Sequence, residues 1–332
     1  MFYSLPTETK LDIFKYLNYQ QLCSVKQTNL NLYDFVNKYK GELAREELYC
    51  ISIDYFKFKK DPRTTLIKPK AENFDFPLNE QFEEEWINEL EKPIPLYLPQ
   101  NSNDIVICLS KVNDYETSYI LQLPTIIKSK EDIKIVYYYL SRLFNCYFVY
   151  ADFDEFIFNP ELLQLLFGNA KIPKQFYLML EAFLTPSKAY NNGKLLKFVV
   201  NHLICESIRV NFILKNNAEE YVDLLRKILM NGDKFKNVEF KCRHDMPELF
   251  DFVINYIKTS KDCLKMVANI KLDKIGSNFD SLNEKAEEVE EASGRWNKPI
   301  YQISNIYNPK IKFSIVYTGY INNGVKFKRI YC

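Results

Sequence analysis

The chain has 332 residues, of which 47% are hydrophobic and 26% charged, so it can bury one sizeable core with a small appended unit. Its formal net charge of +1 supplies no broad positive field, which argues against general binding to nucleic acid or to an anionic membrane surface. The eight cysteines are scattered without a CxxC pair, and no apolar run is long enough to span a bilayer, so we expect a reducing location in the cytoplasm, the nucleus or both.

Residues 1–48 have the pattern of a small helical unit. Pro6 precedes a segment over 7–17 whose apolar residues follow helical spacing, and two more short helices are predicted over 20–25 and 30–39. Three helices of this length are below the size that usually folds well alone. Because the unit carries more apolar side chains than so small a core can bury, we expect it to dock on a partner.

Residues 49–102 differ in composition and are interpreted as a connector that packs on the body of the protein. They contain a strand pattern over 51–56, a charged segment with several prolines, and a helical pattern over 79–90. We place the body itself at residues 103–332.

The body alternates strand and helix patterns. Helices are predicted near 161–167, 194–204, 218–230 and 247–258, and strands over 105–109, 118–123, 146–150, 155–158, 175–180, 207–212, 237–241 and 266–272. The last three strands start about 30 residues apart, a spacing typical of stacked strand–helix repeats. An acidic segment over 281–291 predicts an exposed helix. Near the end, Asn322-Asn323-Gly324 predicts a hairpin turn between strands over 310–317 and 325–331.

Apolar and polar residues alternate within the last three of those repeated strands. Ile208 and Val210 flank Arg209, for example, and the next two strands show the same pattern. This predicts helices over one sheet face and a polar opposite face, unlike a doubly wound sheet buried on both sides. The predicted polar face consists of Arg209, Asn211, Glu239, Lys241, Asn269 and Lys271. Plain solvent exposure and a recognition surface both explain it. Tyr177 and Met179 either extend this face or belong to the core.

We therefore expect an α+β or α/β protein. A small N-terminal three-helix unit is followed by an irregular, leucine-rich-repeat-like strand–helix solenoid that ends in a β-hairpin.

Catalytic patterns are absent from the sequence. There is no Gly-rich phosphate loop, GxSxG turn or HExxH helix, and the chain has two histidines. The best metal-ligand candidates, His202/Cys205 and Cys242/His244, are expected roughly 20 Å apart on neighbouring parallel strands, too far for one zinc ion. We expect no metal, no cofactor and no enzymatic activity.

The N-terminal residues carry a resemblance. Leu5-Pro6-Thr7-Glu8, followed by Leu11, Ile13, Phe14, Tyr16 and Leu17 and then by Leu22 and Val25, resembles the F-box over about residues 3–45. Asn29-Leu30-Asn31-Leu32-Tyr33 stands where that family has a Cys/Arg-x-Trp pattern. In its architecture, the downstream half looks like the expanded F-box families of nematodes.

The resemblance implies a substrate-recognition subunit of a Skp–cullin–F-box ubiquitin ligase. Its partners would be a Skp-type adaptor, a cullin reached through that adaptor, and an unknown protein substrate bound by the C-terminal body on the polar face. By matched position, the adaptor contacts would be Leu5, Pro6, Leu11, Ile13, Phe14, Leu17, Leu22 and Val25, although some of these must instead hold the three helices together. The alternative is a protein- or ligand-binding adapter that acts outside a ubiquitin ligase.

Overall fold

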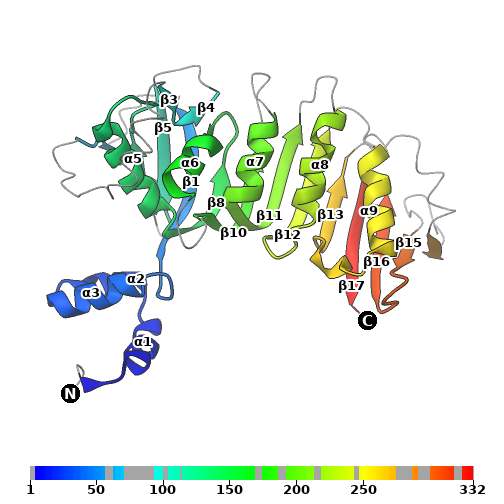
Figure 1. Cartoon of the computed structure of the whole chain (residues 1–332), viewed down its shortest axis with the longest axis horizontal. Coiled ribbons are helices and arrows are strands. Elements are labelled where there is room, and N and C mark those ends of the chain that lie inside the picture. Colours follow the sequence, from blue (N-terminus) through cyan, green and yellow to red (C-terminus); the bar gives the residue numbers. More distant parts are fainter. Residues whose placement is uncertain are drawn as a thin grey trace.

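The computed structural model describes residues 4–56, 63–70, 93–99, 104–112, 114–168, 174–185, 192–212, 218–242, 247–273, 286–290, 300–317 and 324–331. It is a mixed α/β protein in which three N-terminal helices lie beside one end of a long sheet (Figure 1). The expected mixture of helices and strands and the three N-terminal helices are confirmed, whereas the expected repeat solenoid is not shown. The helix expected over 79–90 lies outside the described residues.

The N-terminal unit consists of α1 (Thr7–Lys15), α2 (Tyr19–Lys26) and α3 (Leu30–Lys38). Asn18 and Asn29 begin the second and third helices, because each side chain accepts a hydrogen bond from a backbone N–H of the first turn. The unit has its own small core, separate from that of the body, formed by Leu11, Phe14, Leu22, Val36 and Leu43.

One large sheet contains thirteen strands within the described residues, in the order β14-β15-β16-β17-β13-β12-β11-β10-β8-β1-β5-β6-β2. The strands are β1 (Glu46–Tyr55), β2 (Thr64–Ile67), β5 (Ile105–Lys111), β6 (Asp114–Leu121), β8 (Cys146–Asp152), β10 (Phe176–Leu184), β11 (Leu203–Phe212), β12 (Phe235–Cys242), β13 (Asn269–Leu272), β14 (Glu287–Glu290), β15 (Ile300–Ser304), β16 (Ile311–Tyr317) and β17 (Val325–Tyr331). Two short antiparallel pairs lie outside it, β3 (Ile94–Pro95) with β7 (Ile126–Ile127) and β4 (Tyr97–Leu98) with β9 (Ile157–Phe158).

The centre of the sheet is parallel. From β1 through β8, β10, β11 and β12 to β13, each strand pairs in parallel with the next. On one side of this centre, the strands follow in the order β13, β17, β16, β15 and β14, and each pairs antiparallel with the next. On the other side, β1 pairs antiparallel with β5, and β5 pairs antiparallel with β6. Helices lie along one face of this sheet (Figure 1). They are α5 (Lys130–Leu143), α6 (Pro160–Phe167), α7 (Asn192–His202), α8 (Ala218–Leu229) and α9 (Pro247–Thr259), and a short 3₁₀ turn, η3 (Cys263–Lys265), follows α9.

The main core fills the space between the sheet and these helices. Strand residues at alternate positions, such as Ile208 and Phe240, are fully buried, as are helix residues such as Val253. An aromatic cluster occupies one region of the core, where Phe158 stacks on Phe176 with ring centroids 5.3 Å apart. In 208–211 of β11, 238–241 of β12 and all of β13, buried and partly exposed side chains alternate, so the alternation read in the sequence follows from the helices that cover one face.

Several expected elements differ in the structure. The predicted connector, residues 49–102, contributes most of β1, which lies between β8 and β5 inside the large sheet. The prediction of an acidic helix over 281–291 is wrong, because residues 287–290 form the edge strand β14. The pairing of β14 with β15 outweighs the helix preference of these residues. The strand expected over 155–158 is confined to 157–158.

The C-terminal hairpin is confirmed, since β16 and β17 pair antiparallel. Of the expected turn, Gly324 is described, and Asn322 and Asn323 lie outside the described residues. Within the described part of the chain, no helix is both long and apolar enough to cross a membrane.

Candidate binding surfaces

The six residues expected on a polar sheet face do share one face. Register pairs Arg209 with Glu239 and Glu239 with Lys271, and it pairs Asn211 with Lys241. The intervening apolar positions are buried under the helices, so these polar side chains lie on the opposite face. Their placement is confirmed, whereas their role in binding a substrate remains a prediction.

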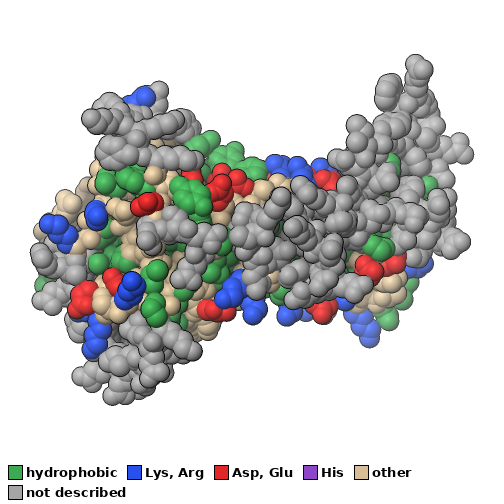
Figure 2. Space-filling model, turned by 90° about the horizontal axis from the view of Figure 1, so that it is seen from above, with side chains coloured by type: hydrophobic (Ala, Val, Ile, Leu, Met, Phe, Trp, Pro, Cys, Tyr) green, Lys and Arg blue, Asp and Glu red, His purple; other side chains and the backbone are tan. Residues whose placement is uncertain are grey.

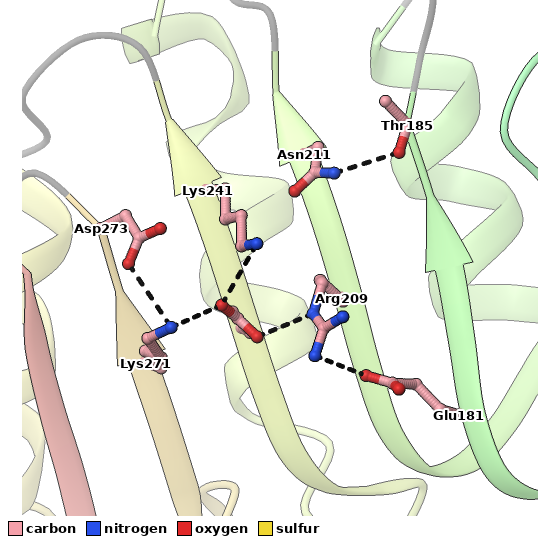
Figure 3. A network of polar contacts seen from close by, with 8 residues as sticks. Glu181, Thr185, Arg209, Asn211, Lys241, Lys271 and Asp273 are labelled. Carbon is pink, nitrogen blue, oxygen red and sulfur yellow. Dashed lines mark hydrogen bonds and ion pairs between the residues drawn. The ribbon is translucent and has the colours of Figure 1, made fainter. Parts of the chain in front are cut away.

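Glu239 is the centre of the contacts on this face, and Figure 3 shows its partners Arg209, Lys241 and Lys271. Its Oε2 accepts a hydrogen bond from Arg209 Nε at 2.8 Å, and its Oε1 accepts one from Lys271 Nζ at 2.7 Å. Lys241 Nζ lies 3.8 Å from the same Oε1. We call Glu181, Arg209, Glu239, Lys241, Lys271 and Asp273 the charged ladder.

Two further carboxylates lie at the ends of the charged ladder. Glu181 of β10 lies 3.3 Å from Arg209, and Asp273, just after β13, lies 3.8 Å from Lys271. Neither residue was predicted from the sequence. The predicted strand over 175–180 ended before Glu181, and a bulge between Leu178 and Glu181 interrupts the alternation that would have pointed to it.

Hydrogen bonding shifts the pKa values of Glu239 and Arg209 within the charged ladder. Burial alone would raise the pKa of Glu239, but the hydrogen bonds from Lys271 and Arg209 outweigh it and hold that pKa below its ordinary value. The same contact with Glu239 raises the pKa of Arg209. By formal charge, the three carboxylates and three basic side chains of the charged ladder sum to zero.

A more apolar region adjoins the charged ladder on β10. Met179 and Leu180, at the bulge, expose 45% and 43% of their surface. Tyr177 lies half-buried, and the Arg45 guanidinium stacks 4.2 Å from the centre of its ring. Tyr177 and Glu181 both lie on the face opposite the helices, so Tyr177 extends this face and is not a core residue.

In Figure 2 the upper outline is the side that faces away from the viewer in Figure 1. Lys and Arg (blue) and Asp and Glu (red) side chains gather along the middle of this outline, beside a hydrophobic area (green). A surface with mixed charge and an apolar neighbour is suited to contact with another macromolecule.

The N-terminal unit offers a second surface. Of the eight predicted adaptor contacts, Leu11, Phe14 and Leu22 are buried in the unit's own core, where Leu17 and Val25 pack against them. Leu5 is half-buried, whereas Pro6 and Ile13 are exposed. The structure adds three exposed apolar residues to this unit that the sequence analysis did not assign: Tyr16, Leu30 and Tyr33.

The residues weighed as metal ligands are only partly described. His202 and Cys205 are buried, and burial raises the pKa of the Cys205 thiol. The side chain of Cys242 and all of His244 lie outside the described residues. Among the residues that the structure describes, no group of three or more His, Cys, Asp and Glu side chains could hold a metal ion.

The fold and these surfaces define an α/β protein with a one-sided helical layer, an open polar sheet face and a separate helical unit. A family model described as a domain of unknown function (DUF8381) matches residues 67–213, from the last residue of β2 to the residue after β11. This part of the chain is similar to that family, and the match crosses the boundary predicted at 102/103. No curated protein and no solved structure matches the chain.

Proposed function

We propose that this protein is a substrate-recognition subunit of a Skp–cullin–F-box ubiquitin ligase. The N-terminal unit would bind a Skp-type adaptor, and the polar sheet face would bind a protein substrate. The observation that carries the proposal is the F-box-like pattern on a three-helix unit with exposed apolar side chains. The comparison with family models detects no F-box domain, so the support is the residue pattern and the exposure of these side chains.

Exposure divides the predicted adaptor contacts into two groups. Pro6 and Ile13 are accessible and would enter the interface, together with Tyr16, Leu30 and Tyr33. The buried residues of the small core would hold the helices in place instead. Apolar anchors of this kind usually contribute most of the affinity of an interface.

For the body, we propose a leucine-rich-repeat-like solenoid. The support is that successive parallel strands stack in chain order with helices along one face (Figure 1). Each strand–helix unit would bury its apolar face against the next, and the uncovered strand face would serve as a continuous recognition surface.

In this role the protein carries out no bond chemistry. Holding a substrate and the ligase machinery in one complex raises the local concentration of substrate near the activated ubiquitin. The proposal places the protein in the cytoplasm, the nucleus or both, and it needs no cofactor.

Binding to a purified Skp-type adaptor tests the proposal. The full-length chain should bind, and the double variant Pro6→Ala/Ile13→Ala should bind at least about tenfold more weakly, because two apolar anchors are lost. Ile306→Ala is the matched control, since Ile306 is also an exposed apolar residue (57%) but lies on the body. Equal binding by the double variant and the control would refute the assigned interface, and no binding by wild type would refute the function.

The second candidate is a binding protein that works outside a ubiquitin ligase. It is favoured by the sequence of α3, where Leu30 and Tyr33 replace the pattern expected for an F-box. If the adaptor binds but no cullin is recovered with the complex, this second function is the better explanation.

A further inference from the structure

A cavity of about 290 Å³ lies where β10, β11 and β12 begin. Its walls are formed by the C-terminal ends of α6 and α7 and by the residues that precede β10 and β12. Its lining is Leu163, Gln164, Phe167, Gly168, Lys174, Gln175, Asn201, His202 and Lys234. Two lysines, one histidine and three amides therefore line the cavity, and none of its lining residues that the structure describes is a carboxylate.

His202 presents an unsatisfied nitrogen in this cavity. The side chain is 93% buried, and its Nδ1 lies 3.2 Å from the backbone carbonyl oxygen of Lys174. Because a carbonyl can only accept, Nδ1 carries the proton and Nε2 of the neutral ring is left with a lone pair. Nε2 is buried and has no hydrogen-bond partner among the described residues.

The lysines bring positive charge that the described residues do not neutralise by ion pairing. Lys234 Nζ donates to the carbonyl of Val200 at 2.8 Å, which leaves two of its N–H groups for other acceptors. Burial, and then the nearby cations Lys40 and Arg45, lower the pKa of Lys174. Within the described ranges, neither lysine of the cavity makes an ion pair with a carboxylate.

We propose that this cavity binds a small tetrahedral oxyanion, either phosphate or the phosphate group of a monoester. The ammonium groups of Lys174 and Lys234 would hold two of its oxygens. His202 would hold a third after Nε2 takes up a proton and becomes a donor. The anion would thus accept hydrogen bonds from three charged donors, and such charge-assisted bonds are stronger than neutral ones.

Proton uptake is the signature that separates this site from a cavity filled by water. The groups around His202 are the Phe198 ring on its own helix, the backbone carbonyl of Lys174 before β10 and the Lys234 side chain before β12, with Asp233 beside Lys234. Burial lowers the pKa of His202, the hydrogen bond to Lys174 opposes this, and Lys234 adds to the lowering. A bound anion reverses the balance because it stabilises the imidazolium.

Imidazole NMR on the full-length chain tests the proposal directly, because the protein has only two histidines, His202 and His244. Sulfate is the first probe, since it stays doubly charged throughout the titration, and chloride keeps the ionic strength constant. Saturating sulfate should raise the pKa of His202 by about one unit or more, which corresponds to at least tenfold tighter binding to the protonated form. The pKa of His244 should not follow.

Calorimetric titrations with sulfate and with inorganic phosphate supply the second measurement. Lys174→Gln should weaken binding of both anions at least about tenfold. Lys236→Gln, a control for an exposed lysine on β12, should leave the affinity unchanged. A phosphoserine peptide, compared with inorganic phosphate, distinguishes a phosphorylated protein segment from the free anion. An unmoved His202 pKa, or equal affinities for the two lysine variants, would overturn the proposal.

Discussion

Replacing Glu239 with Gln should destabilise the protein although the two side chains have nearly the same shape. Gln cannot offer a charged acceptor to Arg209 and Lys271, which now donate at 2.8 and 2.7 Å. The Glu239 side chain is only 16% exposed, whereas its two partners are 34% and 38% exposed. Because solvent screens the charges of those two partners, the effect should lie between that of a surface ion pair and that of a buried one. We expect the free energy of unfolding to fall by about 1–2 kcal/mol.

Denaturant unfolding at pH 7 measures this loss, and its dependence on pH tests the cause. The pKa of Glu239 is depressed in the folded state, so its contribution to stability is fully present above its unfolded pKa and is lost as the pH falls through the folded value. Protonated Glu239 resembles Gln, so the gap between wild type and Glu239→Gln should close in acid. Glu206→Gln is the control, because its carboxylate is 45% exposed and lies 3.8 Å from Lys236. Equal stabilities of the two variants at pH 7, or a gap that persists in acid, would refute the reasoning.

Three further substitutions test the packing of the fold by the same unfolding assay. Gly232→Ala should cost about 1–3 kcal/mol, because the new Cβ would lie 2.7 Å from the backbone oxygen of Met266, whereas Gly41→Ala meets nothing within 4 Å and should be nearly neutral. Asn305→Ala should lower the free energy of unfolding by about 2–4 kcal/mol, because the buried amide makes four hydrogen bonds to backbone groups at the end of α9 and in the turn after β15. The backbone amide hydrogens of that turn should also exchange faster in this variant. Phe14→Ala should cost about 3–4 kcal/mol and melt the N-terminal helices first, a loss visible as early hydrogen exchange in α1 to α3.

Strand positions were predictable from the sequence wherever one face of the sheet is buried. From Ile208 onward in β11 and from Val238 onward in β12, apolar and polar residues alternate, because the helices cover every second side chain there. The same signal predicted that Arg209 and Glu239 share a face. It failed at the bulge of β10, where the two successive exposed residues Met179 and Leu180 break the period of two and hide Glu181.

Long-range pairing was not predictable. β1 lies between β8 and β5, with partners far along the chain, and no local pattern in 49–102 specifies such neighbours. The edge strand at 287–290 forms by pairing with β15 against the helical preference of its glutamates. Burial in the N-terminal unit was ambiguous for a related reason: Leu11 and Ile13 are both apolar residues of one helix, but only the structure shows which of them points into the small core.

The neutral charged ladder constrains how any partner can bind to this face. Its cations are already paired with Glu181, Glu239 and Asp273, so a partner that contacts them must replace existing ion pairs and gains little net affinity. A neutral surface also gives no long-range steering, and association should depend only weakly on salt. The affinity must then come from apolar contact, for which the exposed apolar residues Met179 and Leu180 directly precede Glu181 in the chain. The charged ladder would instead reject partners whose charges do not match its alternating pattern, which makes it a source of specificity.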